Sequence, residues 1–215
     1  MRPFLFPLML GLMAISASAQ DFSLNFGGGV IGHLRFDGTT LQSSVTSGPM
    51  GVGNGKFEAS VRNVRLETGE AAFQYLSFAP AKGRTISVLY KDGVTTETAV
   101  SPANDRTALS DAAAVPAGVV TPVEAFDQLV NAKGCPNDLS FYDGRRVISI
   151  ARAAQSENAG RLICDLTYKV THGPGHLSPL FIKRASLQAT YTAVGSQQLL
   201  KLSVSSGPFT LDVVR

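Results

Sequence analysis

The chain has 215 residues, of which 44% are hydrophobic and 16% are charged. It is long enough to bury one sizeable core and too apolar to be disordered. The charged fraction lies below the roughly 25% of an average soluble domain, while 21 glycines, 11 prolines and the absence of tryptophan favour short strands and turns. The 19 basic and 16 acidic residues are spread along the chain, without the clustering that a nucleic-acid interface needs.

The N-terminus has the organisation of a secretory signal peptide. Its parts are the positively charged Arg2, the uncharged apolar stretch Phe4 to Met13, and the small residues Ala17-Ser18-Ala19. We predict a cleaved signal over residues 1–19 and a single β-rich domain over 20–215, periplasmic or secreted from a bacterium. An apolar stretch of about ten residues is too short for a membrane anchor, which needs roughly twenty, and no later segment predicts a transmembrane span. Cleavage would leave the net charge one unit below the +3 of the full chain.

The chain contains two cysteines, Cys135 and Cys164. An even number of cysteines in an exported protein predicts a disulfide bond, so we expect these two to be joined. Closing a loop of about thirty residues would contribute on the order of 3–4 kcal/mol in the chain-entropy model. There is no C-x-x-C motif of the kind that serves redox catalysis, so the expected role of the bond is structural.

Alternation of apolar and polar residues with a period of two predicts strands through the first half of the mature chain. Asp92-Gly93 separates two such segments and predicts a hairpin turn. A change of phase after Val61 predicts a β-bulge near Asn63 that would bend the sheet. The apolar positions of these strands are Phe22, Leu24 and Phe26; Val30, Leu34 and Phe36; Phe57, Ala59 and Val61; Val64 and Leu66; Phe73 and Tyr75; Ile86, Val88 and Tyr90.

One helix is predicted near 122–133, after a long loop near 101–120 that has no clear period and either covers the domain or lines an opening. The helix signals are the cap Thr121, Pro122 at the first position, Glu124 completing a capping box, and Gly134 just beyond the end. Helical spacing places Val123, Phe126, Leu129 and Val130 on one side, which we expect to face a sheet.

Strands resume after the helix and continue to the C-terminus. The predicted segments are Leu139 to Tyr142, Arg145 to Ala154, Arg161 to Val170, Leu180 to Arg184, Leu187 to Val194, Leu199 to Ser205 and Pro208 to Val214. We therefore predict a mainly β fold of about ten strands, a curved antiparallel sheet or an incomplete β-barrel with the one helix inserted. Apolar residues on both faces of several strands make an apolar cavity a reasonable expectation.

Three stretches of the sequence resemble a bacterial exported family, catalogued as domain of unknown function three-one-zero-eight. They are Thr121-Pro122-Val123-Glu124-Ala125-Phe126 with the following Cys135, Phe141-Tyr142-Asp143-Gly144-Arg145-Arg146, and Cys164-Asp165-Leu166-Thr167-Tyr168. The family tends to have Asp at the place of Thr121 and Phe at that of Tyr142. The resemblance implies an envelope protein with a curved sheet around a helix, similar to periplasmic lipoprotein carriers. It brings no catalytic residues.

Enzyme signatures are absent from the sequence: there is no G-x-S-x-G elbow, no H-E-x-x-H motif and no second pair of cysteines for zinc. His172 and His176 flank a short turn and are weak candidates for a metal site that lacks a third ligand. We expect no cofactor and no catalytic residues.

The densest polar group is the candidate ligand-binding site. Arg145 or Arg146 would grip a carboxylate or phosphate and Tyr142 would stack on a ring. The alternative is a plain turn in which Asp143 caps its own backbone, and turn chemistry favours this by about two to one. Arg152 and Tyr168 would extend the polar patch, and Phe126, Leu129, Ile148 and Ile150 would form an apolar lining.

Three functions remain open at this stage. The first is a non-enzymatic binding or carrier module for an amphiphilic or lipid-like ligand of the envelope. The second is a structural or protein-interaction component of the envelope, and the third, least favoured, is a hydrolase or metal-dependent enzyme.

Overall fold

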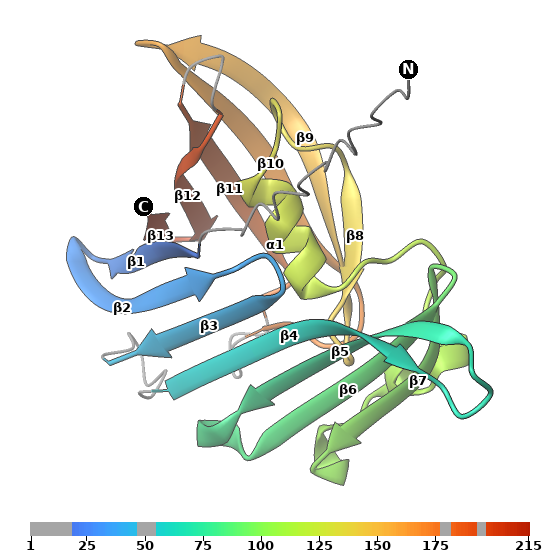
Figure 1. The fold of residues 1–215 in the computed structure, drawn as a ribbon. Coiled ribbons are helices and arrows are strands. Elements are labelled where there is room, and N and C mark those ends of the chain that lie inside the picture. Colours follow the sequence, from blue (N-terminus) through green and yellow to red (C-terminus); the bar gives the residue numbers. More distant parts are fainter. Residues whose placement is uncertain (1–18, 47–54, 177–181, 193–196) are drawn as a thin grey trace, which may run out of the picture.

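The computed structural model describes residues 19–46, 55–176, 182–192 and 197–215, which form one antiparallel sheet of thirteen strands and one α-helix (Figure 1). The helix is α1 (Pro122–Val130). The strands are β1 (Gln20–Phe26), β2 (Gly29–Phe36), β3 (Thr40–Val45), β4 (Gly55–Arg65), β5 (Ala71–Ala79), β6 (Arg84–Lys91), β7 (Val94–Ser101), β8 (Leu139–Tyr142), β9 (Val147–Asn158), β10 (Arg161–His172), β11 (Arg184–Tyr191), β12 (Leu199–Ser206) and β13 (Phe209–Val214).

Each strand pairs with its neighbours in the sequence, except that β7 and β8 do not pair, and β1 also pairs with β13. The order in space is therefore β7 to β1 followed by β13 to β8, which leaves β7 and β8 as the two edges of a sheet that is not closed. The predicted hairpin at Asp92-Gly93 is confirmed, because both residues adopt positive φ, 51° and 75°. A two-residue turn of this kind matches the right-handed twist of the strands it connects.

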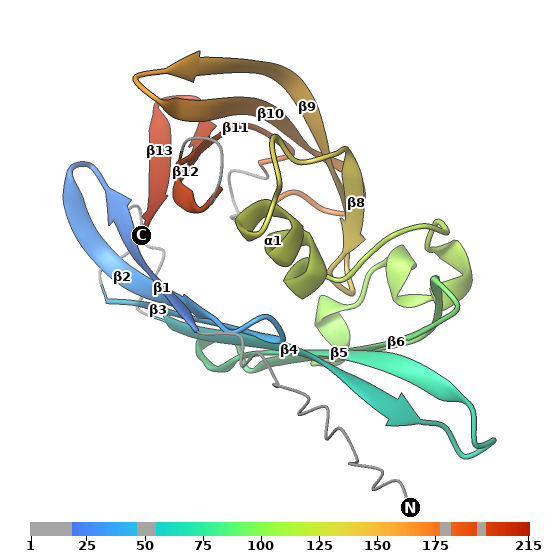
Figure 2. The same ribbon diagram turned by 45° about the horizontal axis from the view of Figure 1, so that its top comes forward.

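The sheet curls around α1, so that its two edges approach one another (Figures 1 and 2). The segment between β7 and α1 covers both edges. Its short 3-10 turns η3 (Ala103–Asp105), η4 (Ala108–Ser110) and η5 (Ala112–Ala114) pack against β7, and Val120 forms a parallel bridge with Phe141 on β8. Three apolar residues of this segment, Leu109, Val115 and Val119, are buried. The predicted loop is thus a cover over the sheet edges.

The strand count differs from the prediction of about ten, since the described residues contain thirteen. The Ser/Thr-rich β3 has a weak apolar pattern but is hydrogen-bonded to β2 and β4 on its two sides. The predicted four-residue strand Leu139 to Tyr142 is β8, which is paired with β9. Pairing on the ladder therefore sustains a strand such as β3, which its side-chain pattern alone marks only weakly.

The predicted bulge near Asn63 is wrong. The register of β4 against β5 runs without a shift from Glu58↔Phe78 to Arg65↔Ala71. Register shifts occur instead in other pairs, including Leu24/Asn25 between β1 and β2. The opposite phase of Val64 therefore reflects a partly exposed apolar residue on the outer face, not an extra residue in the strand.

The helix begins as predicted but is shorter than 122–133. Thr121 Oγ1 accepts a hydrogen bond from Glu124 N (3.1 Å) and Glu124 Oε2 accepts one from Thr121 N (2.8 Å), which completes the capping box. The helix ends at Val130, because Asn131 leaves helical geometry with φ −106° and ψ 20°. This early end lets the chain turn through Gly134 (φ 125°) and bring Cys135 to β10.

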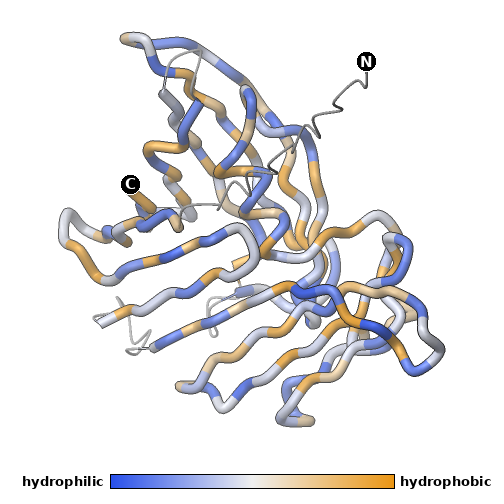
Figure 3. Tube along the Cα trace, viewed as in Figure 1, coloured by the Kyte–Doolittle hydropathy of each residue, from blue (hydrophilic) through white to orange (hydrophobic). Residues whose placement is uncertain are grey.

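The helix packs on the inner face of the sheet. Phe126 contacts the rings of Phe22 and Phe36 edge to face, at centroid distances of 6.0 and 5.2 Å, and Tyr191 Oη donates to Leu129 O (2.7 Å). Apolar and polar residues alternate along most strands (Figure 3). The apolar set faces inward and forms a single cluster around α1.

The predicted disulfide is confirmed between Cys135, just after α1, and Cys164 on β10, with a Cα–Cα distance of 5.5 Å. No helix among the described residues has the length and apolar character to cross a membrane. Most of the predicted signal peptide (1–18), the start of the predicted strand at 180–184 and the end of that at 187–194 lie outside the described residues.

We predict that a Cys135→Ala/Cys164→Ala variant is less stable than the wild type by about 3 kcal/mol, because the crosslink no longer restricts the unfolded chain. For a domain of this size this lowers the melting temperature by about 6–12 °C. Calorimetry measures the change. Wild-type protein under reducing conditions should show the same shift, and an unchanged midpoint in both samples would contradict a stabilising role.

Candidate functional site

The turn at 143–146 joins β8 to β9. It packs against β6, which belongs to the other arm of the curled sheet, formed by β1 to β7. Asp143 Oδ1 accepts hydrogen bonds from the backbone N of Arg145 and of Arg146, both at 2.9 Å, as predicted for a turn-capping aspartate. Gly144 has φ 91°, and a Cβ there would lie 2.2 Å from Ile86 Cγ2 on β6. The turn therefore depends on glycine both for its backbone angle and for its close approach to β6.

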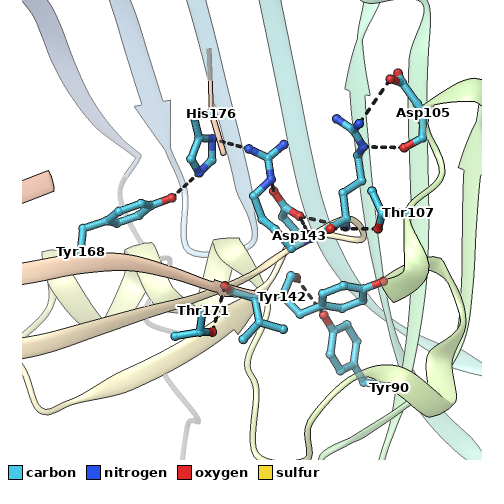
Figure 4. A network of polar contacts seen from close by, with 11 residues as sticks. Tyr90, Asp105, Thr107, Tyr142, Asp143, Tyr168, Thr171 and His176 are labelled. Atoms are coloured by element: carbon cyan, nitrogen blue, oxygen red, sulfur yellow. Dashed lines mark hydrogen bonds and ion pairs between the residues drawn. The ribbon is translucent and has the colours of Figure 1, made fainter. Parts of the chain in front are cut away.

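Arg146 lies in a buried chain of polar contacts that ends at Tyr168 (Figure 4). Its side chain is 9% exposed; Nε lies 2.9 Å from Asp143 Oδ2, and Nη1 donates to His176 Nδ1 at 2.5 Å. A guanidinium can only donate, so Nδ1 of His176 is the acceptor and the neutral ring carries its proton on Nε2. That N–H then donates to Tyr168 Oη, 2.5 Å away.

His176 is held in the neutral form by this environment. Burial lowers its pKa from the usual 6.5 to about 4, and the positive charges of Arg146 and Lys82 act in the same direction. Burial raises the pKa of Tyr168, so the hydroxyl keeps its proton. Desolvation raises the pKa of the Asp143 carboxyl. The charge of Arg146 and the hydrogen bonds from two backbone amides lower it by a smaller amount, so the pKa stays above its usual value.

Arg145 points to a second carboxylate, on the segment that covers the sheet edges. Its Nη2 lies 3.5 Å from Asp105 Oδ1 and its Nε donates to Asp105 O at 2.6 Å. The same carboxylate receives Arg84 Nε, from β6, at 2.5 Å. The pKa of Asp105 is lowered by the hydrogen bond from the Arg84 side chain. The positive charges of Arg84 and Arg145 lower it further. Thr107 Oγ1 adds a hydrogen bond to Arg145 O at 3.0 Å.

Tyr142 links the two edges of the sheet and is fully buried. Its hydroxyl donates to Leu109 O in the covering segment and lies 3.2 Å from Thr98 Oγ1 on β7. Its own carbonyl accepts from Tyr90 Oη at 3.1 Å. Tyr142 is therefore surrounded by protein, and no face of its ring is open for the stacking we expected.

The structure brings Tyr142, Asp143, Arg145, Arg146 and Tyr168 to one end of the sheet. Arg152 lies apart from them, exposed on β9, where its backbone N donates to Asp138 Oδ1. Of the apolar candidates, Leu129, Ile148 and Ile150 are buried and Phe126 is partly buried against the core. The apolar candidates pack within the domain, and Arg152 does not join the polar group.

Sequence reasoning missed the partners of the site: Tyr90, Asp105, Thr107, Lys82 and Arg84. Each lies on a strand or turn tens of residues away from 143–146, and no local motif marks it. His176 was singled out, but as a weak metal candidate. Its Nδ1 faces a guanidinium, and His172 is exposed with Nδ1 3.1 Å from Thr171 Oγ1. In the described parts of the chain no three His, Cys, Asp or Glu side chains are arranged to hold a metal ion.

Part of the inner face at this end of the sheet is apolar and only partly buried. The register places the ends of β1, β3, β5, β7 and β12 on the same side as the 143–146 turn. The partly exposed inward residues here are Ile31, Leu34, Val45, Phe57, Val204 and Leu211. At the opposite end, under α1, the corresponding residues Phe22, Phe36, Ala59 and Leu199 are buried.

The outer face of the sheet carries a separate groove of about 470 Å³ across β1 to β5. Its lining includes the outward side chains of Asp21, His33, Arg35, Gln42, Ser44, Lys56 and Glu58, together with Leu34, Ser43 and Phe57, with Phe78 and Pro80 at one end. Phe78 is 50% exposed. The groove therefore combines charges of both signs with apolar surface.

The chain matches no protein-family model and no curated protein. The resemblance to the exported family stays a prediction, and the site is interpreted from its own geometry.

We predict that His176 makes stability depend on pH between 7 and 4. The unfolded histidine titrates near 6.5 and the folded one near 4, so in this window the unfolded state binds more protons and acid destabilises the fold. A His176→Gln variant can still accept from Arg146 and donate to Tyr168 but does not titrate. Its loss of unfolding free energy from pH 7 to pH 4 should be smaller by about 2–3 kcal/mol.

Urea unfolding at each pH measures this difference. His172→Gln is the matched control, because His172 lies on the same segment but is exposed, and it should keep the wild-type pH profile. Parallel profiles for wild type and His176→Gln would show that His176 is not buried in the neutral form.

Proposed function

We propose that the protein is a non-enzymatic binding or carrier module, and that its ligand is an amphiphile whose apolar part lies on the partly exposed inner face of the curved sheet. The observation that carries this proposal is the uneven cover that α1 gives the inner face. The expected export to the periplasm and the resemblance to an envelope family fit the same proposal.

The helix is too short to cover the sheet. Its nine residues span about 13 Å, whereas the eight residues of β2 or β12 extend over about 26 Å. The contacts of α1 with Phe22 and Phe36, its bond to Tyr191 and the disulfide to Cys164 hold it toward one end. Apolar side chains at the other end therefore keep partial contact with water, which is typical of ligand or partner surfaces.

The site residues support binding over catalysis. Asp143, Tyr168 and His176, three buried groups of the site with shifted pKa values, are each engaged with protein partners. A neutral histidine whose Nδ1 accepts from Arg146 has no lone pair left to take a proton from a substrate. The polar contacts therefore support a structural role, in which Arg145, Asp105 and Arg84 hold the two arms of the sheet together.

A second candidate function is a protein-interaction component of the envelope, which the outer groove favours. Its charged residues of both signs, beside the exposed Phe78, suit a segment of a partner that carries both polar and apolar side chains. The two functions use opposite faces of the sheet, so variants on each face separate them.

Binding of the hydrophobic fluorescent probe N-phenyl-1-naphthylamine tests the amphiphile proposal. We expect saturable fluorescence enhancement with the wild type. Val204→Gln places an amide on the inner apolar face and should weaken binding by about tenfold, because the amide loses water without gaining a partner.

Ser205→Gln is the matched control. The adjacent side chain faces the outer side, where Ser205 Oγ contacts Thr210 Oγ1 at 2.9 Å, and the probe should bind as to the wild type. Native mass spectrometry of protein purified from its own envelope should also detect a bound amphiphile. No saturable binding, or equal loss in both variants, would refute the inner-face site and favour the interaction role.

A further inference from the structure

The polar end of the sheet holds more positive than negative charge. Four cationic side chains, Lys82, Arg84, Arg145 and Arg146, gather there from the turn η2 (Pro80–Lys82), from β6 and from the 143–146 turn. We name these four residues the cationic cluster. They influence one another electrostatically, since Arg84, Arg145 and Arg146 all act on Lys82, and Lys82 acts on His176.

Among the residues that the structure describes, two carboxylates face the cationic cluster, and their acceptor oxygens are occupied. Asp105 receives both Arg84 and Arg145. Asp143 receives two backbone amides at Oδ1 and Arg146 at Oδ2. Within the described residues Lys82 has no hydrogen bond and no ion pair, so the cluster keeps an uncompensated positive charge.

Tyr168 supplies an additional hydrogen-bond donor on the same side. Its oxygen accepts the Nε2 proton of His176, so its own O–H must donate elsewhere, and the described residues offer it no acceptor. Tyr168 faces inward from β10, where its ring contacts Phe141.

The cationic cluster adjoins the apolar inner surface. Arg84 shares the inward face of β6 with the buried Ile86, and it pairs in register with Ala79 on β5. The turn η2 packs against β4, and the charge of Lys82 on this turn acts on both His176 and Asp105. An apolar wall thus ends at an unneutralised positive group, which is the layout that an anionic amphiphile requires.

We propose that the cationic cluster binds the anionic headgroup, a carboxylate or a phosphate, of the amphiphile whose chain lies on the inner face, with Lys82 as its principal counter-ion. This inference rests on the proposed function and narrows its ligand class to anionic amphiphiles. Arg145 and Arg146, fixed by their carboxylates, line the site, and the free ammonium of Lys82 closes on the headgroup.

Competition against N-phenyl-1-naphthylamine with ligands of one chain length tests the proposal. Dodecanoate and dodecyl phosphate should displace the probe at lower concentration than the neutral monododecanoyl glycerol. In Lys82→Gln the two anions should bind about three- to tenfold more weakly, the effect of one partly exposed charge-assisted contact, while the glycerol ester is unchanged. Lys82 is exposed, so the melting temperature should stay at the wild-type value.

Lys169→Gln is the matched control, because Lys169 is an exposed lysine on the outer face near the same end of the sheet. It should leave all three affinities as in the wild type. Equal affinities for anionic and neutral ligands, or equal losses in Lys82→Gln and Lys169→Gln, would overturn the headgroup site and leave the inner-face function standing. Failure of every ligand and of the probe would overturn the proposed function itself.

Inorganic phosphate alone, titrated by calorimetry, separates the two sources of an anion. We expect it to bind far more weakly than dodecyl phosphate, because it lacks the chain that contacts the inner face. Equal affinities would identify a site for free anions and overturn the proposal.

Discussion

The fold depends on closing the gap between β7 and β8, the two edges of one curled sheet. An exposed strand edge presents unpaired N–H and C=O groups and is a template for unwanted pairing. Here the segment before α1 covers both edges, through Val120 on β8 and the turns η3 to η5 on β7. Tyr142 and the 143–146 turn contact that segment, β6 and β7. The seam, which is the junction between the edges β7 and β8, is therefore held by polar contacts and not by a ladder of backbone hydrogen bonds between the two strands.

This solution explains why charge gathers at one end of a chain that is poor in charged residues. The seam needs donors that reach backbone carbonyls and carboxylates across a gap, and arginine side chains do so with several donors each. Arg145 reaches across the gap to the backbone and carboxylate of Asp105, and Arg146 binds Asp143 and His176 on its own side of the gap. Because the arginines outnumber the carboxylates they meet, closing the seam leaves positive charge beside the inner face.

Local signals in the sequence predicted the elements but not their meeting points. The period of two, the Thr121 capping box and the Asp92-Gly93 turn each act within a short span, and all three are confirmed. The cysteine pair, predicted from the even count, is confirmed as well. The strand count was too low, since β3 is sustained by its partners more than by its own pattern. The site was half predicted: 143–146 is a local motif, whereas Arg84, Asp105 and His176 reach it only because the sheet curls.

The end of α1 shows how one long-range constraint determines which surface stays open. Sequence signals favoured a helix up to Gly134, but the chain leaves helical geometry at Asn131 and bends so that Cys135 meets Cys164. The disulfide and the hydrogen bond from Tyr191 together hold the C-terminal end of α1 at the covered end of the sheet. The apolar surface beside the cationic cluster follows from that anchoring, because no other helix among the described residues lies on the inner face.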